Sequence, residues 1–293
     1  MGTEIDPDYA HRHSIVDELF IKTADDNYVT ARWCFTYSLN VDFFWLAVHA
    51  LEKYLKAALL LNGRSSKKYA HDIIKLYANV RPLAPELLPA KLTCPPEIAS
   101  ADWHDEPTET FIAQLLRFGQ ADNRYQLYGY ISRREDVFKL DQVVFAVRRL
   151  CQPLESHFLG KKCPGVPDVS RREMLKDPAS TNLQANLHSH LEEIIDGKRG
   201  KLLRHVALNW NFPFAPKGFK HTRIRYRTAV VEPVLVRRIL VPLESGHPEQ
   251  EALSDRLWSW VSLNLQLSVD FLNAYEKSRD KKKAAAKAKA KGT

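Results

Sequence analysis

Residues 42–63, DFFWLAVHALEKYLKAALLLNG, constrain the fold of this chain more than any other stretch. Asn40 or Asp42 can cap the start of a helix there, and Gly63 stands where a glycine commonly ends one. Apolar residues cover most of the circumference, which is typical of a helix buried on most sides. The segment is long enough to span a membrane, but the four ionisable residues in its middle oppose that. We therefore predict the central helix of a helical bundle.

The polar residues of this predicted helix share one narrow stripe. At about 100° per residue, the spacing aligns Asp42 with the four ionisable side chains, which are His49, Glu52, Lys53 and Lys56. Glu52 and Lys56 have the spacing of an ion pair along a helix. The stripe is either a solvated strip with an ordinary ion pair or a polar seam within the bundle, and the sequence leaves both interpretations open.

The net charge of +8 is concentrated at one end of the chain. Residues 277–293 hold seven lysines and one arginine against one aspartate, so the rest of the chain is close to neutral. The charge of the folded part therefore does not indicate a phosphate-binding face. We predict that this Lys/Ala-rich tail is disordered, and both salt-dependent nucleic-acid binding and a solubilising role fit its composition.

Four widely spaced cysteines without a Cys-x-x-Cys motif indicate a reducing compartment and no zinc site. The amino-terminal residues contain no apolar segment of a secretion signal. The pairs His11–His13 and His188–His190 have no carboxylate or cysteine companions, which argues against metal ligation. We expect a cytoplasmic protein that binds no metal or other cofactor and does not enter a membrane.

The periodic patterns predict a mainly α protein in three parts. The first part is a helical bundle over residues 8–160, the second a smaller α+β domain over 165–276, and the third the disordered basic tail 277–293. The helices predicted around the central one cover residues 27–39, 73–80, 109–118 and 135–158. The elements predicted after the proline-rich boundary at 164–167 are helices over 182–196 and 249–275 and strands over 206–214, 224–231 and 234–241.

The first part of the chain resembles the HEPN domain family. The features that carry the resemblance are the segment DFFWLAVHA, the run EKYLKA that begins at Glu52, the His71–Asp72 pair before a helix, and Arg124–Tyr125 before the last helix. The resemblance implies an up-and-down bundle of about four or five helices that commonly forms a homodimer. It also implies work on nucleotides or RNA. Many members are ribonucleases in defence or toxin–antitoxin systems, and others are non-catalytic binding modules.

Catalytic HEPN proteins use an Arg-x4–6-His motif without a metal, in which His acts as general base on the RNA 2′-hydroxyl and Arg stabilises charge on the phosphate. Arg64 and His71 have this spacing, and so do Arg199 and His205. Chance alone yields about as many matches in a chain with this composition. Arg64 and His71 follow the second helix, whereas the family usually carries the motif on a late helix. They are nevertheless our candidate catalytic pair.

The candidate nucleotide- or phosphate-binding residues are His49, Lys53, Lys56, Arg124 and Tyr125. In the alternative interpretation, Lys53 and Lys56 pair with Glu52 and Asp72, and Arg124 only holds a loop. A further group of arginines, at positions 223, 225 and 227, would share one face of a predicted strand, either as a nucleic-acid face or as an ordinary exposed one.

Two functions remain open on the sequence. One is a HEPN-type protein that binds nucleotide or RNA and acts as a metal-independent endoribonuclease. The other is a non-catalytic, dimeric helical interaction module. The paired-aspartate signature of the nucleotidyltransferases that often accompany HEPN proteins is absent, so such a partner would be a separate chain.

Overall fold

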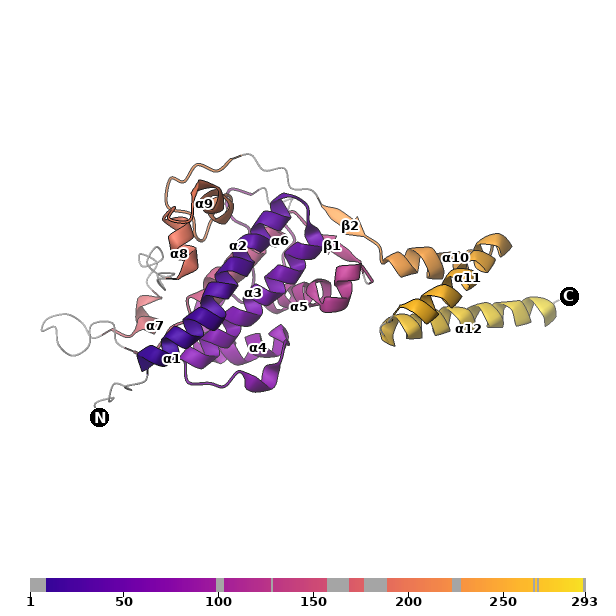
Figure 1. Cartoon of the computed structure of the whole chain (residues 1–293), viewed down its shortest axis with the longest axis horizontal. Helices are drawn as coiled ribbons and strands as arrows, with labels where there is room; N and C mark the ends of the chain where they lie inside the picture. Colours follow the sequence, from indigo (N-terminus) through magenta and orange to yellow (C-terminus); the bar gives the residue numbers. More distant parts are fainter. Residues whose placement is uncertain are drawn as a thin grey trace, which may run out of the picture. The chain divides into compact units, whose positions relative to one another are not determined.

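The computed structural model describes residues 9–98, 103–127, 129–156, 169–176, 189–222, 228–265, 267 and 269–291. The chain divides into two compact units. Unit 1 comprises residues 1–120 and 132–228, and unit 2 comprises residues 121–131 and 229–293. The described residues are mainly helical and contain one two-stranded sheet (Figure 1). Among these residues, no helix combines the length and the apolar composition needed to cross a membrane.

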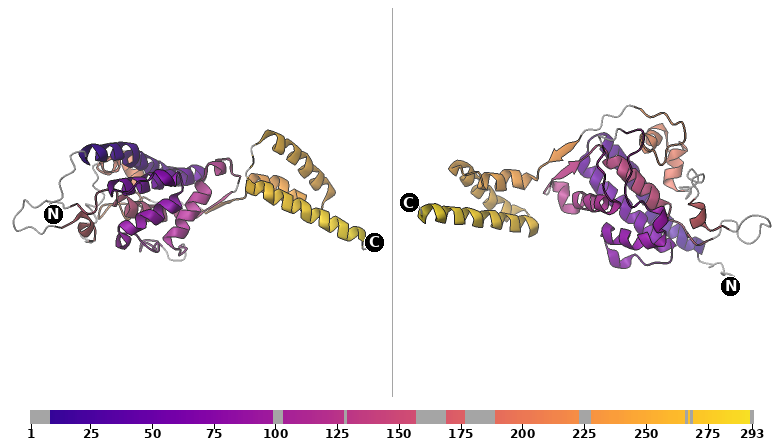
Figure 2. Two further views of the ribbon diagram at one scale, coloured as in Figure 1. Left: turned by 90° about the horizontal axis from the view of Figure 1, so that it is seen from below. Right: turned by 180° about the vertical axis from the view of Figure 1, so that it is seen from behind.

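Unit 1 is a helical bundle centred on α3. Its helices are α1 Tyr9–Val16, α2 Lys22–Thr36, α3 Asn40–Leu61, α4 Ile73–Val80, α5 Thr108–Gly119, α6 Asp136–Arg148, α7 Arg171–Met174, α8 His190–Ile195 and α9 Lys201–Leu208. A π-helical turn, Asp17–Ile21, joins α1 to α2. Helix α3 packs against α2, α4, α5 and α6 (Figures 1 and 2). The predicted central helix is therefore confirmed, with bounds shifted by two residues.

The packing around α3 follows from its apolar circumference. Phe43, Phe44 and Leu55 are fully buried. Phe44 lies edge-on to Phe118 of α5, with ring centroids 5.2 Å apart. At the end of α5, a Cβ on Gly119 would lie 2.3 Å from the carbonyl oxygen of Phe44. Only glycine permits this approach, so Gly119 sets how closely α5 packs on α3.

Helix α6 ends ten residues before the predicted boundary at 158. Proline disfavours helical conformation in the residue before it and lacks an N–H donor, and Pro153 follows the end of α6 closely. Cys151 and Leu154 are nevertheless buried, as the pattern indicated. The apolar run thus marked burial correctly, although its end is not helical.

The predicted strand 206–214 is wrong. Helix α9 occupies the first part of that segment, and an irregular segment follows it. Phe212 lies 5.8 Å from Phe138, and Phe214 lies 5.2 Å from Phe145, measured between ring centroids, so both aromatic side chains pack on α6. Their alternation reflects docking on the bundle, not pairing in a sheet.

Helix α8 is joined to the bundle by a buried ion-pair cluster. The Arg148 guanidinium donates to both carboxylate oxygens of Asp25, at 2.8 and 3.0 Å, and to both of Glu192, at 2.6 and 2.8 Å. The Tyr54 hydroxyl and the backbone N–H of Leu191 also donate to Asp25, at 2.5 and 2.9 Å. Each polar atom of the Asp25 carboxylate is thereby satisfied in the core, which burial requires.

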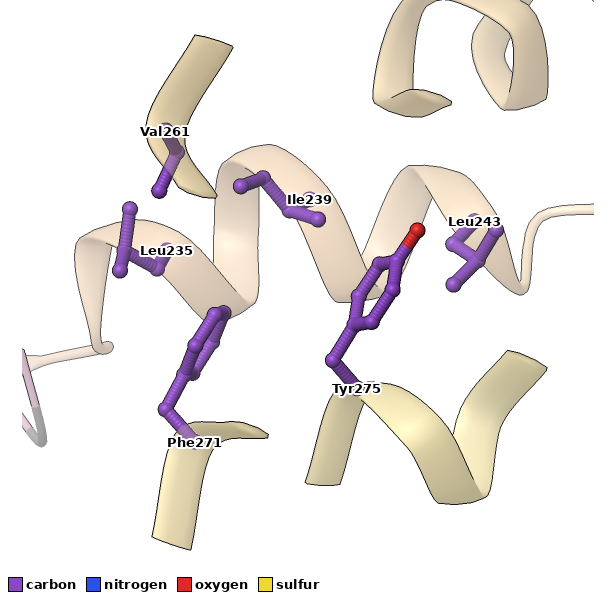
Figure 3. Packing of buried hydrophobic residues seen from close by; sticks show 6 residues of the cluster. All are labelled: Leu235, Ile239, Leu243, Val261, Phe271 and Tyr275. Carbon is purple, nitrogen blue, oxygen red and sulfur yellow. The ribbon is translucent and has the colours of Figure 1, made fainter. Parts of the chain in front are cut away.

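Unit 2 is built mainly from helices. Its elements are a 3-10 turn Ala121–Tyr125, β1 Tyr130–Ser132 (whose last residue belongs to unit 1), β2 Ala229–Val231, a π-helical turn Val236–Leu240, α10 Val241–Leu243, α11 Pro248–Asn264 and α12 Val269–Lys291. Figure 3 shows its core, in which Leu235, Ile239 and Leu243 face Phe271 and Tyr275 of α12. Leu127 packs against the same cluster.

Three predictions for this region are corrected. The segment 234–241 is helical, because Leu235, Ile239 and Leu243 recur every four residues and bury one helical face. The predicted helix 249–275 is interrupted between Asn264 and Val269, and α11 and α12 pack on each other through Trp258 and Tyr275, whose rings stack at 3.6 Å. The tail predicted to be disordered continues α12 as far as Lys291.

The two compact units differ from the predicted domains 8–160 and 165–276. Residues 121–131 belong with the carboxy-terminal helices, because β1 pairs with β2 and the backbone N–H of Val234 donates to the carbonyl of Gln126 at 3.2 Å. Residues 189–222 instead belong with the bundle. Of the predicted strand 224–231, only Ala229–Val231 forms β2, and the arginines at 223, 225 and 227 lie outside the described residues.

Candidate functional site

The polar stripe of α3 lies in unit 1 beside the loop that precedes α4. The Glu52 side chain is its centre and is buried, with 6% of the residue exposed. The Lys56 ammonium lies 2.7 Å from Glu52 Oε1, which confirms the predicted i,i+4 pair. The Nδ1 atom of His49 lies 3.8 Å from Oε2. The buried Glu52 carboxylate therefore lies near one side chain from the preceding turn of α3, His49, and one from the following turn, Lys56.

His71 reaches the same carboxylate from outside the helix. Its Nδ1 atom lies 3.0 Å from Glu52 Oε1 and 3.1 Å from Oε2. Because an ionised carboxylate only accepts hydrogen bonds, Nδ1 is the protonated nitrogen in this contact. The His71 side chain is 83% exposed, whereas that of Glu52 is 8% exposed. The ring is thus anchored at one nitrogen and accessible elsewhere.

The backbone around His71 is shaped by its two neighbours. Ala70 has φ of 46° and ψ of −114°, a conformation that residues with a Cβ rarely adopt. Asp72 caps α4 by accepting the backbone N–H of Lys75 at 3.0 Å, and this hydrogen bond is the main reason why the pKa of Asp72 is lowered. A strained residue and a helix cap therefore place the His71 ring against α3.

Lys53 does not pair with Glu52. Its ammonium donates to Asn27 Oδ1 at 2.6 Å and lies 3.4 Å from the carbonyl oxygen of Thr23 on α2. Burial lowers the pKa of Lys53, and the carboxylates of Glu52 and Asp26 oppose that effect. Lys53 joins α2 to α3 at the edge of the cluster. The alternative interpretation paired Lys53 and Lys56 with Glu52 and Asp72. Of these pairs the structure shows that of Lys56 with Glu52, whereas Asp72 pairs with Lys75 at 3.0 Å.

The other predicted site residues lie elsewhere. The Arg64 guanidinium donates to the carbonyl of Asn79, near the carboxy-terminal end of α4, whereas His71 precedes its start. Arg124 and Tyr125 belong to unit 2, where Arg124 Nε donates to the carbonyl of Ala121 at 3.2 Å and Tyr125 is 74% exposed. The structure thus joins His71, Lys56 and His49 through Glu52, and Arg64 is bound to a different element.

Sequence reasoning did not assign a functional role to Glu52. The i,i+4 spacing to Lys56 indicated an ion pair only, because contacts between residues 19 positions apart cannot be read from helical spacing. Within the described part of the chain, no group of three or more His, Cys, Asp or Glu side chains could hold a metal ion. His190 contacts the Asp26 carboxylate at 3.3 Å, and His188 lies outside the described residues.

No protein-family model, no curated protein and no solved structure matches this chain.

Proposed function

We propose that this chain is a HEPN-type protein that binds RNA and acts as a metal-independent endoribonuclease, with His71 as its general base. The observation that carries the proposal is the contact of His71 Nδ1 with the buried Glu52 carboxylate, at 3.0 and 3.1 Å. A base oriented by a third group is the recurring arrangement of nucleophilic catalysis. The exposed ring leaves Nε2 available for a proton from substrate.

The proposed reaction uses the nucleophile of the RNA itself. The 2′-hydroxyl oxygen attacks the adjacent phosphorus, the bond to the 5′-oxygen breaks, and a 2′,3′-cyclic phosphate forms. His71 Nε2 accepts the proton of the 2′-hydroxyl, and the leaving 5′-oxygen takes a proton from solvent. The Glu52 carboxylate stabilises the imidazolium that results.

Two lysines supply positive charge in this scheme. Lys56 shares the Glu52 carboxylate with His71, so we assign to it the stabilisation of charge on the phosphate oxygens. Lys53 and His49 add to phosphate binding at the edge of the cluster. Arg64 is assigned a structural role, because its guanidinium bonds near the far end of α4. By the same resemblance we propose a homodimer and, as partner, a separately encoded nucleotidyltransferase.

The test is cleavage of a mixed RNA pool by the full chain in EDTA. We expect His71→Ala to lower the rate by about 10²-fold or more, the usual contribution of a general base. Glu52→Gln keeps a hydrogen-bond acceptor but removes the charge, so it should also lower the rate. The matched control is His104→Ala, because His104 is also an exposed histidine and has no role in the proposed scheme. Cleavage that survives His71→Ala would refute the assigned base, and a chain that neither binds nor cleaves RNA would refute the function.

A specific observation favours the alternative, a non-catalytic dimeric interaction module. Unit 2 exposes large apolar side chains on α11 and α12, with Trp260 59%, Leu263 84% and Val269 70% exposed. Trp260 and Leu263 are three residues apart and so share one face of α11, and apolar side chains exposed on one face commonly mark interaction surfaces. The discriminating measurement is the mass in solution of the full chain and of Leu263→Ser. A dimer that dissociates in the variant, together with no RNA binding, would support this alternative.

A further inference from the structure

The basic end of the chain is helical. Helix α12 spans Val269–Lys291, so the segment whose composition predicted disorder has a regular backbone almost to its end (Figure 1). From position 281 on, its sequence is KKKAAAKAKAKGT, which contains no acidic residue. Alanine and lysine both favour helix, and lysines near a carboxy-terminal end also complement the helix dipole. The positive charges of this segment are therefore held at fixed spacings along one helix.

The contacts of α12 define which side of the helix faces the rest of unit 2. Phe271 and Tyr275 are buried in the core of the unit. Further along, the Lys282 ammonium lies 2.9 Å from a carboxylate oxygen of Glu251 on α11. At about 100° per residue, these three positions of α12 lie within about 40° of one another. One side of α12 is thus occupied by unit 2, and the other sides are open to a partner.

A row of four cations lies outside the occupied side. Arg279, Lys283, Lys287 and Lys291 follow one another at intervals of four residues, so they share a slowly winding stripe about 18 Å long. We call these four residues the basic stripe. Arg279 and Lys283 are exposed, and neither forms an ion pair with another residue that the structure describes. Asp280 is the last acidic residue of the sequence, so beyond it the stripe carries only positive charge.

A regular row of positive charges fits a polyanion. RNA carries a phosphate at every nucleotide, and contacts of lysine and arginine with phosphates supply affinity without sequence preference. A solubilising tail requires charge but no particular register, whereas the stripe is defined by its register on a helix. We propose that the basic stripe binds the phosphate backbone of RNA. This inference rests on the proposed ribonuclease function and assigns to α12 the retention of the substrate.

Two variants with the same net charge test the stripe. The first, the stripe variant, replaces all four cations of the basic stripe with glutamine. The second is the matched control, and it replaces four lysines of α12 outside the stripe with glutamine, at positions 277, 281, 282 and 289. Glutamine favours helix about as well as lysine, so both variants should keep α12 helical. Circular dichroism of the full chains checks this.

The measurement is fluorescence anisotropy of a labelled single-stranded RNA of mixed sequence, titrated with the full chain at several salt concentrations. Each phosphate that a cation neutralises contributes about 0.7 to the slope of log K against log salt for a single strand. We therefore expect the stripe variant to lower this slope by about 3 and the affinity at low salt by about tenfold or more. The control should change the slope by about 1 or less.

Three results would overturn the inference. Unchanged binding in the stripe variant would show that the stripe does not contact RNA. Equal losses in the two variants would mean that net charge, without register, accounts for binding. Polyglutamate is the probe for an acidic protein partner, and stripe-dependent binding of polyglutamate without stripe-dependent binding of RNA would assign the stripe to such a partner.

Cleavage kinetics separate this inference from the function on which it rests. We expect the stripe variant to raise KM for the RNA pool in EDTA and to leave kcat unchanged, because the stripe holds substrate and takes no part in the reaction. Cleavage that depends on His71 but has the same KM in both variants would overturn the inference and leave the ribonuclease proposal intact. Stripe-dependent RNA binding without cleavage would support the inference and refute the nuclease.

Discussion

At the scale of single residues, the core of unit 1 contains charged side chains. The periodic pattern of apolar residues in the sequence does not predict their burial. Lys139, Glu106, Glu135 and Asp136 are all buried, and the Lys139 ammonium bonds to Glu106 and lies 3.7 Å from Glu135. Three carboxyl groups thus lie near one ammonium group. Burial raises the pKa of Asp136 to about 7, although the backbone N–H of Arg133 donates to its carboxylate at 2.7 Å.

Asp136 should make stability depend on pH. Its pKa is about 7 in the folded chain and about 4 in an unfolded one. Between these values the folded state holds a proton that the unfolded state releases, so the free energy of unfolding falls as pH rises from about 4 to about 7. Asp136→Asn removes the titrating carboxyl group and with it this loss of stability at rising pH. We expect the variant to gain stability relative to the natural chain between pH 5 and pH 8, by on the order of 2 kcal/mol.

The measurement is the free energy of unfolding in urea, for the natural chain and for Asp136→Asn, at pH 5 and at pH 8. Asp196→Asn is the control, because the Asp196 carboxyl is 57% exposed and substitution there should leave the pH dependence unchanged. A difference between Asp136→Asn and the natural chain that stays constant with pH would contradict the prediction.

At the scale of elements, α8 illustrates how a short helix becomes part of a bundle. It has only six residues and buries Leu191 and Ile194. A helix this short is not stable alone, since helix formation has a costly nucleus. Its attachment depends on Arg148, which bridges Glu192 of α8 and Asp25 of α2 from α6. The ion-pair cluster therefore specifies where α8 docks.

Arg148→Met should destabilise unit 1 by about 3–5 kcal/mol, because it leaves the buried Asp25 carboxylate without its cation. Arg172→Met removes a surface pair with Glu86 and should cost about 1 kcal/mol or less. Denaturant unfolding of the two variants gives the comparison. Equal losses would mean that the buried cluster contributes no more than an exposed pair.

At the scale of the whole molecule, the chain forms two units with separate cores. The core of unit 2 is the cluster of Figure 3, and that of unit 1 surrounds α3. The chain passes between the units after residues 120, 131 and 228, so unit 2 combines two distant segments. Residues 121–131 cannot be assigned to a unit from their position in the sequence, because their partners, β2 and the cluster around Ile239, come about a hundred residues later.

Ile239→Ala should destabilise unit 2 by about 2–4 kcal/mol through the cavity that it leaves in the core, since Ile239 is 1% exposed. Hydrogen exchange followed by mass spectrometry should then show faster exchange in α11 and α12 but unchanged exchange in α3. Leu51→Ala, in the core of unit 1, is the reciprocal control and should affect α3 and not α12. Faster exchange throughout the chain in both variants would show that the two units unfold together.

Local patterns were sufficient for the elements whose faces are defined by nearby residues. The sequence by itself determined α3, because the apolar circumference of residues 42–63 is a local property, and it determined the Glu52–Lys56 pair, because i,i+4 neighbours meet on any helix. Helices α4 and α5 agree with their predicted bounds to within one residue. His71 was a candidate base because its spacing from Arg64 resembles the HEPN motif.

Tertiary structure alone decided which surfaces cover one another. The segments 206–214 and 234–241 have β-branched and aromatic residues typical of strands, yet both pack as helix or irregular chain on neighbouring helices. The contact of His71 with Glu52 and that of Arg148 with Asp25 join residues 19 and 123 positions apart. Periodicity reports which side of a segment is apolar, but the partner that buries it depends on the whole chain, and so the local pattern cannot supply it.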